Sequence, residues 1–431
     1  MVNRLYNILL GRHCQSRSVA ARDHMNGGTA ASQRWDGAKR KICAAVACAG
    51  LVATPSFAQS SISEVLGSIE ANNPTLKISA MELEATRLEN NASVLPEDPE
   101  IEFNYLWGQN SEVGNRKDFR VTQSFDIPTL TGMRSNQASA RNDQAALRYK
   151  ADRLEVLLEA KQLCIDLIYN NLLYKELSRH LEDAETLAKV TDRKKDFGES
   201  SSLEVNKAKL HLASVKGQLS KVDVERARIL SELRQLNGGE NISLEATEYD
   251  PEDLPADFQS WYSQAAEKNP VLQYVGQEIA IGMNQIRIDK ASWLPNLTVG
   301  YMSEIGLSDK YRGVTLGIAI PLWRNTNKIR QTTSRINIAR TAQTQAEQEF
   351  YNRLLRNYNE ASGLKDIAEG YKYSLEETDN RVLLIEARTK GEISMIDYLV
   401  ETDLYYDSLE EYLSAERDYR KALATLNAVN L

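Results

Sequence analysis

Two long stretches of the chain carry apolar residues at helical spacing and lack strong helix breakers. Residues 134–197 contain neither Gly nor Pro. Apolar side chains recur there in steps that alternate near three and four, at Leu147, Ala151, Leu154, Leu158, Ile165, Ile168 and Leu172. This spacing is typical of a coiled-coil seam. Residues 326–390 repeat the pattern, with Gly363 and Gly370 as weaker points. We therefore predict two long helices, each packed along a partner helix, 203–236 or 394–429.

A glycine stands where each long helix is expected to end. Gly198 and Gly391 can adopt the left-handed backbone that terminates a helix. Serines follow both glycines, and those at 200–202 and Ser394 can cap the next helix. The sequence therefore predicts two helical hairpins.

Four shorter segments alternate between apolar and polar residues, as strands do. They span residues 101–107, 119–127, 297–303 and 313–320. The apolar faces include the aromatic residues Phe103, Tyr105, Trp107 and Tyr301, and the polar faces include Glu102, Asn104, Arg120, Thr122 and Asp126. Two interpretations stay open: an ordinary half-buried sheet, or membrane strands with aromatic residues at the lipid interface.

A membrane sheet of only four strands would have two open edges, which hydrocarbon does not tolerate. Copies of the chain would have to share strands to close it. Two copies would give an eight-stranded barrel filled by side chains, whereas three would leave room for a lumen. Because the polar faces favour a wet interior, we expect a trimer.

The same plan of helix, two strands, long helix and helix occurs twice. Asn73-Pro74 matches Asn269-Pro270 at an offset of 196 residues, and three further anchors match at offsets of 193 or 199. A polar stretch with Gly and Pro joins the copies. We predict a first repeat over residues 59–240, a linker over 241–257 and a second repeat over 258–431.

The first 58 residues have the features of an export signal. A basic group at residues 39–41 precedes an apolar run at 42–52 and the small-residue site Ser56-Phe57-Ala58. Residues 1–58 are therefore expected to comprise a signal peptide and an upstream segment. Cleavage after Ala58 would leave Cys164 as the single cysteine, so no disulfide could form within the chain.

Composition excludes several classes of function. The chain has 52 basic and 60 acidic residues, a net charge of −8, which argues against a nucleic-acid partner. The chain contains no run of 18 apolar residues, so no transmembrane helix is predicted. Without a nucleophile–base pair or a phosphate-binding loop, we expect neither an enzyme nor a cofactor. His180 and His211, on separate helices of one hairpin, make no metal-ligand spacing with Cys164, so we expect solvated histidines and no metal site.

The sequence resembles the outer-membrane efflux protein family, the TolC-like channels, over about residues 62–431. The resemblance rests on the duplicated plan, on the strand-ending Ile127-Pro128 and Ile320-Pro321-Leu322-Trp323, and on the turns at 197–205 and 390–399. It implies a mainly α fold with a small β part. Long antiparallel coiled-coil hairpins and four transmembrane strands per chain would complete a 12-stranded β-barrel and an α-helical barrel as a homotrimer. The location implied is the outer membrane of Gram-negative type, with a long periplasmic extension.

The resemblance also implies a function. The channel would be the exit duct of a tripartite efflux system for small molecules, drugs or metal ions. It would work with a periplasmic adaptor and an inner-membrane pump, of resistance-nodulation-division type. The adaptor would contact the turns at Gly198, Gly391 and Ser394. Asp397, and Glu204 in the first copy, would lie at the pore constriction, although Val400 departs from the family's second acidic position.

Other interpretations remain at this stage. Asp397 and Glu204 could simply stabilise helix N-termini, which is compatible with a pore-lining role. A periplasmic adaptor or an exported coiled-coil scaffold would also contain helical hairpins. The duplication argues against the adaptor, and the paired amphipathic strands argue against the scaffold.

Overall fold

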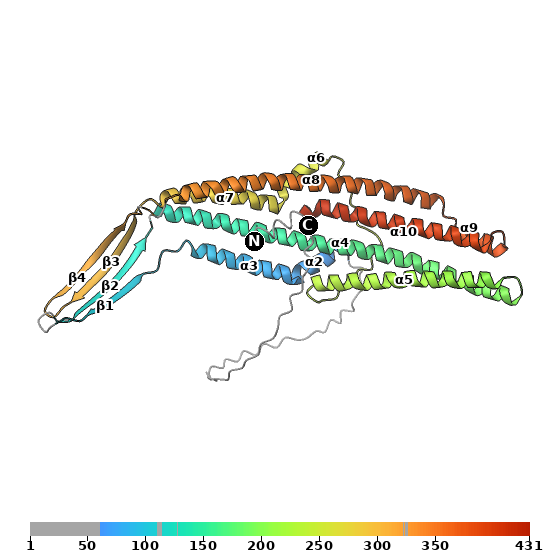
Figure 1. Ribbon diagram of the computed structural model, residues 1–431, viewed down its shortest axis with the longest axis horizontal. Coiled ribbons are helices and arrows are strands. Elements are labelled where there is room, and N and C mark those ends of the chain that lie inside the picture. The colour runs from blue at the N-terminus through green and yellow to red at the C-terminus, as the bar shows by residue number, and fades with distance from the viewer. Residues whose placement is uncertain (1–60, 110–113, 127, 322, 324–325) are drawn as a thin grey trace, which may run out of the picture. The chain divides into compact units, whose positions relative to one another are not determined.

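The computed structural model describes residues 61–109, 114–126, 128–321, 323 and 326–431 (Figure 1). Residues 59–431 form one structural unit. The predicted export signal, residues 1–58, lies outside the described residues, as do Ile127 and Leu322 of the strand-ending motifs.

The described chain is mainly helical with one small antiparallel sheet, which confirms the predicted fold class. The first half contains α2 (Ile62–Asn72), α3 (Pro74–Ala92), β1 (Glu100–Leu106), β2 (Arg116–Phe125), α4 (Pro128–Asp196) and α5 (Ser202–Leu236). The second half contains α6 (Phe258–Lys268), α7 (Pro270–Ala291), β3 (Asn296–Ile305), β4 (Lys310–Ala319), α8 (Lys328–Glu377), α9 (Arg381–Lys390), α10 (Met395–Leu426) and a 3₁₀ turn (Asn427–Asn430). The order of elements is thus nearly the same in both halves.

Matching caps begin the second helix of each half, α3 and α7. Asn73 accepts a hydrogen bond from the backbone N–H of Leu76, and Asn269 accepts from Val271 and Leu272. A proline follows each asparagine at the first helical position, where its missing N–H costs no hydrogen bond. The Asn-Pro pair therefore starts α3 and α7 in the same way.

Helix α4 is the longest element, at 69 residues, or about 100 Å at the usual rise per residue. It starts at Pro128, six residues before the predicted start at Arg134, and so includes Gly132. Helix α5 packs along it, and α2 packs against α4 near the C-terminal end of α5 (Figure 1). Leu167, Ile168, Ile229 and Leu233 are completely buried in this core. The hairpin therefore has the lengthwise packing that the seam predicted.

The second long helix is not continuous, and the prediction of one helix over residues 326–390 is wrong. Helix α8 ends at Glu377 and α9 begins at Arg381, whereas Gly363 and Gly370 lie inside α8. At the break, the Asp379 carboxylate accepts from the backbone N–H of Arg381 at 3.3 Å and pairs with its guanidinium at 2.7 Å. Short acidic and amide side chains compete with helical hydrogen bonds in this way.

The four strands form one antiparallel sheet in the order β1-β2-β3-β4. The pairing of β2 with β3 joins the two halves of the chain, with Val121 opposite Tyr301 and Thr122 opposite Gly300. A Cβ at Gly300 would lie 2.7 Å from the Val121 carbonyl oxygen, so glycine permits this close approach. The observed strands begin or end up to three residues from the predicted bounds.

The segment between the halves packs onto the first half. Asn237 is buried and accepts hydrogen bonds from Ser68 and Asn72, and Leu244 is buried in the core of α4 and α5. Residues 240–257 contain no helix or strand. Within the described part of the chain, no helix combines the length and the apolar character that crossing a bilayer requires.

Candidate functional site

The apolar side chains of the sheet gather on one face, which no other described segment covers. Cross-strand neighbours on this face include Phe103 with Phe119, Val121 with Tyr301, and Leu297 with Ile318. Many of them are exposed to an unusual degree for large apolar residues; Leu316, for example, is 73% exposed. Such a continuous apolar surface is typical of a contact with lipid or with another protein.

The four aromatic residues predicted to face the membrane differ in their surroundings. Phe103 and Tyr301 lie on the apolar face within β1 and β3. Trp107 lies just beyond β1, and its ring contacts the ring of Tyr105 edge-on, with centroids 5.2 Å apart. The Tyr105 hydroxyl accepts a hydrogen bond from Asn115 at 2.8 Å. Lipid contact of these residues stays a prediction.

The opposite face of the sheet is polar, and several of its charges form ion pairs. Arg120 of β2 forms an ion pair with Glu102 of β1 at 3.1 Å. Arg116 of β2 forms another with Glu304 of β3 at 2.8 Å. These pairs cross the strands, so the sheet has one apolar and one hydrophilic surface, as the alternation predicted.

Both glycine turns have the predicted helix-ending geometry. Gly198 has φ +75° and Gly391 has φ +77°, and no atom lies close to the position that a Cβ would take at either. In each turn the backbone N–H of the residue after the glycine donates to the carbonyl five residues earlier. Glu199 donates to Lys194 and Glu392 donates to Ala387, both at 2.8 Å. This is the Schellman arrangement. The glycines are therefore needed for backbone conformation rather than for space.

The two acidic residues predicted to line the constriction both take part in helix caps. Glu204 accepts hydrogen bonds from the Ser201 backbone N–H at 3.0 Å and from the Ser200 hydroxyl at 2.9 Å, and these contacts lower its pKa. Asp397 donates its backbone N–H to Ser394 at 3.1 Å and accepts from the same hydroxyl at 2.6 Å. Ser201 and Ser394 are thus the N-caps of α5 and α10, as the serines predicted. The role of the two carboxylates in a pore stays a prediction.

Arg388 connects the two turns, a contact that the sequence reasoning missed. Its Nη2 atom lies 3.6 Å from Glu204 Oε1, and its Nη1 donates to the Ile393 carbonyl at 3.4 Å. Asp397 is exposed and has no ion-pair partner among the described residues. The two acidic groups are therefore not equivalent. The negative charge of Glu204 is balanced by Arg388, whereas that of Asp397 has no such partner among the described residues.

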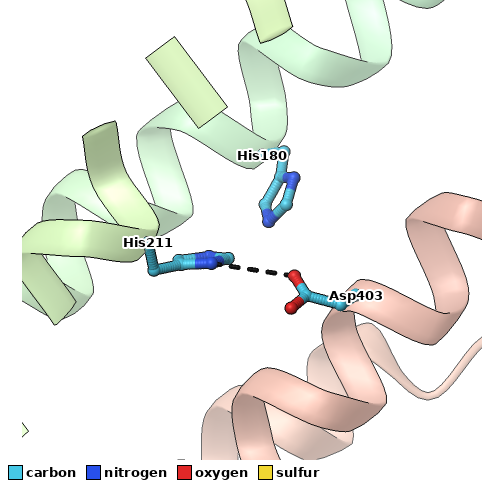
Figure 2. Close-up of side chains that lie close together, drawn as sticks. All are labelled: His180, His211 and Asp403. Carbon is cyan, nitrogen blue, oxygen red and sulfur yellow. Dashed lines mark ion pairs between the residues drawn. The ribbon is translucent and has the colours of Figure 1, made fainter. Parts of the chain in front are cut away.

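The two histidines lie together between helices, and the prediction that they are solvated is wrong. His180 of α4 is only 3% exposed, and its ring centroid lies 5.1 Å from that of His211 of α5. Asp403 of α10 approaches from the other side, with its Oδ1 3.7 Å from His211 Nδ1 (Figure 2). One signal in the sequence pointed to burial, because His180 continues the series of buried residues that includes Leu173, Leu177 and Ala184.

Burial dominates the titration of this cluster. It lowers the pKa of His180 to about 3, with His211 as a second cause, and it also lowers the pKa of His211. The pKa of Asp403 is raised by burial, and His211 partly opposes this. Both imidazoles are therefore neutral near pH 7.

Comparison with known proteins finds one matching family model. Residues 261–429 match the family model described as "Outer membrane efflux protein". No curated protein sequence matches the chain significantly.

Several solved structures share the fold. The Campylobacter jejuni CmeC outer membrane channel has a TM-score of 0.66 at 16% identity, covering 85% of this chain and 85% of its own. The open state of the Neisseria gonorrhoeae MtrE outer membrane channel has a TM-score of 0.66 at 14% identity, covering 85% and 88%. The Vibrio cholerae outer membrane protein VceC has a TM-score of 0.61 at 12% identity, covering 85% and 95%.

These findings confirm the predicted resemblance to the outer membrane efflux proteins, which are channels rather than enzymes. The structural likeness extends over most of the described chain, whereas the family match falls in its second half. Residues 261–429 therefore match the outer membrane efflux protein family, and the solved channels share the fold of most of the described chain.

Proposed function

We propose that three copies of the chain form a passive exit duct across the outer membrane. The observation that carries this proposal is the four-stranded sheet, whose apolar face is exposed and whose outer strands, β1 and β4, have a free edge as far as the described residues show. Open strand edges in hydrocarbon would leave backbone groups without hydrogen bonds. Twelve shared strands remove every edge and enclose the polar face around a lumen.

Strand length supports a membrane span. Strands β2, β3 and β4 each contain 10 residues. A tilted strand needs about 9–11 residues to cross the hydrocarbon core. The half-buried sheet of a soluble protein would instead need a covering layer for its apolar face, and no described segment supplies one.

The helical hairpins would extend the duct into the periplasm. Helix α4 begins three residues after β2 ends and runs for 69 residues before the Gly198 turn, so the turn lies far from the sheet. The turns at Gly198, Gly391 and Ser394 would be the contact for a periplasmic adaptor. An inner-membrane pump, of resistance-nodulation-division type, would supply the energy for export of small molecules, drugs or metal ions.

The carboxylates near the turns would set the ion preference of the duct. Three copies of Asp397, related by symmetry, would focus a negative potential at the narrow end. Glu204 would contribute less, because Arg388 lies 3.6 Å from it. We expect the duct to favour cations.

The architecture can be tested on the detergent-extracted protein. Its mass, corrected for bound detergent, should equal three chains, and the purified protein should give discrete single-channel currents in a planar bilayer. Recovery of the processed chain as a soluble monomer without detergent would contradict the proposal. It would favour the alternatives of a periplasmic adaptor or an exported coiled-coil scaffold.

A further inference from the structure

Three potential metal ligands from three helices converge beside a surface groove. His180 comes from α4, His211 from α5 and Asp403 from α10, and one donor atom of each lies within 4.8 Å of the others (Figure 2). The residues are far apart in sequence, and only the packing of α5 and α10 against α4 brings them together.

The ring nitrogens of His180 are available to bind an ion. Both of its ring nitrogens are buried, and neither has a hydrogen-bond partner in the described part of the chain. Buried polar atoms are nearly always satisfied, so an exception calls for an explanation. The ring is held in place by Tyr406, on which it stacks at a centroid distance of 3.8 Å. This packing fixes the direction of the nitrogens without using them.

The spacing of the donors is close to that of a coordinated ion. Zinc bonds to imidazole nitrogen and carboxylate oxygen of about 2.0–2.2 Å imply donor separations of about 3.4 Å in a tetrahedron. His211 Nδ1 and Asp403 Oδ1 are 3.7 Å apart. All three donor atoms lie within 4.8 Å of one another, so they need to approach by only about an ångström, and the exposed Asp403 side chain can move toward the fixed ring of His180.

The cluster is accessible from solvent. A groove of about 400 Å³ between α5 and α10 is lined by His211, Asp403 and Asp407, among other residues. The Asp403 side chain is 58% exposed, whereas that of His211 is 8% exposed. An ion could therefore enter along the groove, and a water molecule there could complete four-coordination.

We propose that His180, His211 and Asp403 bind one divalent transition-metal ion of the zinc class. Two imidazoles and a carboxylate suit zinc, whereas calcium and magnesium prefer oxygen ligands. The ion would fasten the α4–α5 hairpin to α10, because its ligands come from both sides of the groove. This inference does not rest on the channel function.

Zinc binding to the untagged, processed protein in detergent tests the site. After removal of metals with a chelator, titration with zinc chloride should show one ion bound per chain. His211→Gln and Asp403→Asn should each weaken binding at least about tenfold, since even second-sphere changes at metal sites cost that much. Asp407→Asn is the matched control, because Asp407 lines the same groove outside the cluster, and it should bind as the wild type does.

Cobalt provides a second measurement that does not depend on stability. Co²⁺ bound in place of zinc should give visible absorption bands, and these should be lost in His211→Gln. Wild-type protein that binds no zinc at a ratio near one would overturn the proposal. Equal affinity in the wild type, His211→Gln and Asp403→Asn would overturn it as well.

Discussion

The guanidinium of Arg388 in α9 lies 3.6 Å from the carboxylate of Glu204 in α5. This contact ties the turn of the first hairpin to the last turn before Gly391. Arg388 is also hydrogen-bonded to the carbonyl of Ile393, so one side chain contacts both turns. Both members are partly shielded from water, with side chains 17% and 33% exposed. The pair is therefore placed to hold the two hairpins together where they turn.

Replacement of Arg388 should loosen this end of the hairpins. Arg388→Ala removes the ion pair with Glu204, and a pair of this exposure contributes up to about 1 kcal/mol. If the turns close the proposed duct, single-channel recordings should show a larger mean current. Lys390→Ala is the control, since among the described residues Lys390 forms an ion pair with Glu386 of its own helix alone, at 3.5 Å. Equal mean currents in both variants would show that Arg388 does not help to close the duct.

The two acidic residues should differ in their effect on ion selectivity. Asp397→Asn removes a charge that has no ion-pair partner among the described residues, so the reversal potential in a salt gradient should shift toward lower cation preference. Glu204→Gln should shift it less, because Arg388 already balances that charge. Unchanged conductance and cation preference in Asp397→Asn would rule out a pore-lining role for this residue.

Neighbouring positions on β4 should respond differently to a lysine. Leu316 lies on the exposed apolar face, and Thr315 points to the other face. A lysine on the lipid side of a barrel costs about 2–4 kcal/mol at the bilayer centre. Leu316→Lys should therefore lower the amount of assembled protein in outer-membrane fractions. Thr315→Lys should assemble normally and alter conductance; the reverse pattern would mean that the faces are assigned wrongly.

Stability of the metal-free protein should fall in mild acid because of His180. Burial lowers the pKa of this histidine to about 3, whereas in the unfolded chain it titrates near 6.5. The unfolded state therefore binds the proton first. The stability contribution is complete above about pH 6.5 and is lost as the pH falls, by up to about 1.4 kcal/mol per pH unit.

His211 acts in the same direction as His180, since its pKa is also lowered. Asp403 opposes the loss, because its raised pKa favours the protonated folded state as the pH approaches the carboxyl range. The melting temperature, measured with a chelator present, should fall between pH 7 and pH 5.5. His180→Leu should show a smaller fall. Equal falls in both proteins would exclude His180 as the cause.

Local patterns in the sequence were enough to predict most helices and strands. The ends of α4 and α9 follow from Gly198 and Gly391, because a positive φ and the bonds around it involve only neighbouring residues. Alternation along the strands predicted a sheet with one apolar and one polar face for the same reason. The break after Glu377 was missed because one of its contacts is not local: the guanidinium of Arg381, which pairs with Asp379, also packs over the ring of Tyr405 at 4.5 Å.

The cluster of His180, His211 and Asp403 and the pair of Arg388 with Glu204 could not be predicted in this way. Their members lie on different helices, tens to hundreds of residues apart, and no local spacing relates them. Heptad spacing indicates which side of a helix is buried. It does not determine which helix packs against that side, or in which axial register. Those choices are made when the hairpins pack, because many apolar contacts along α4, α5 and α10 set the register together.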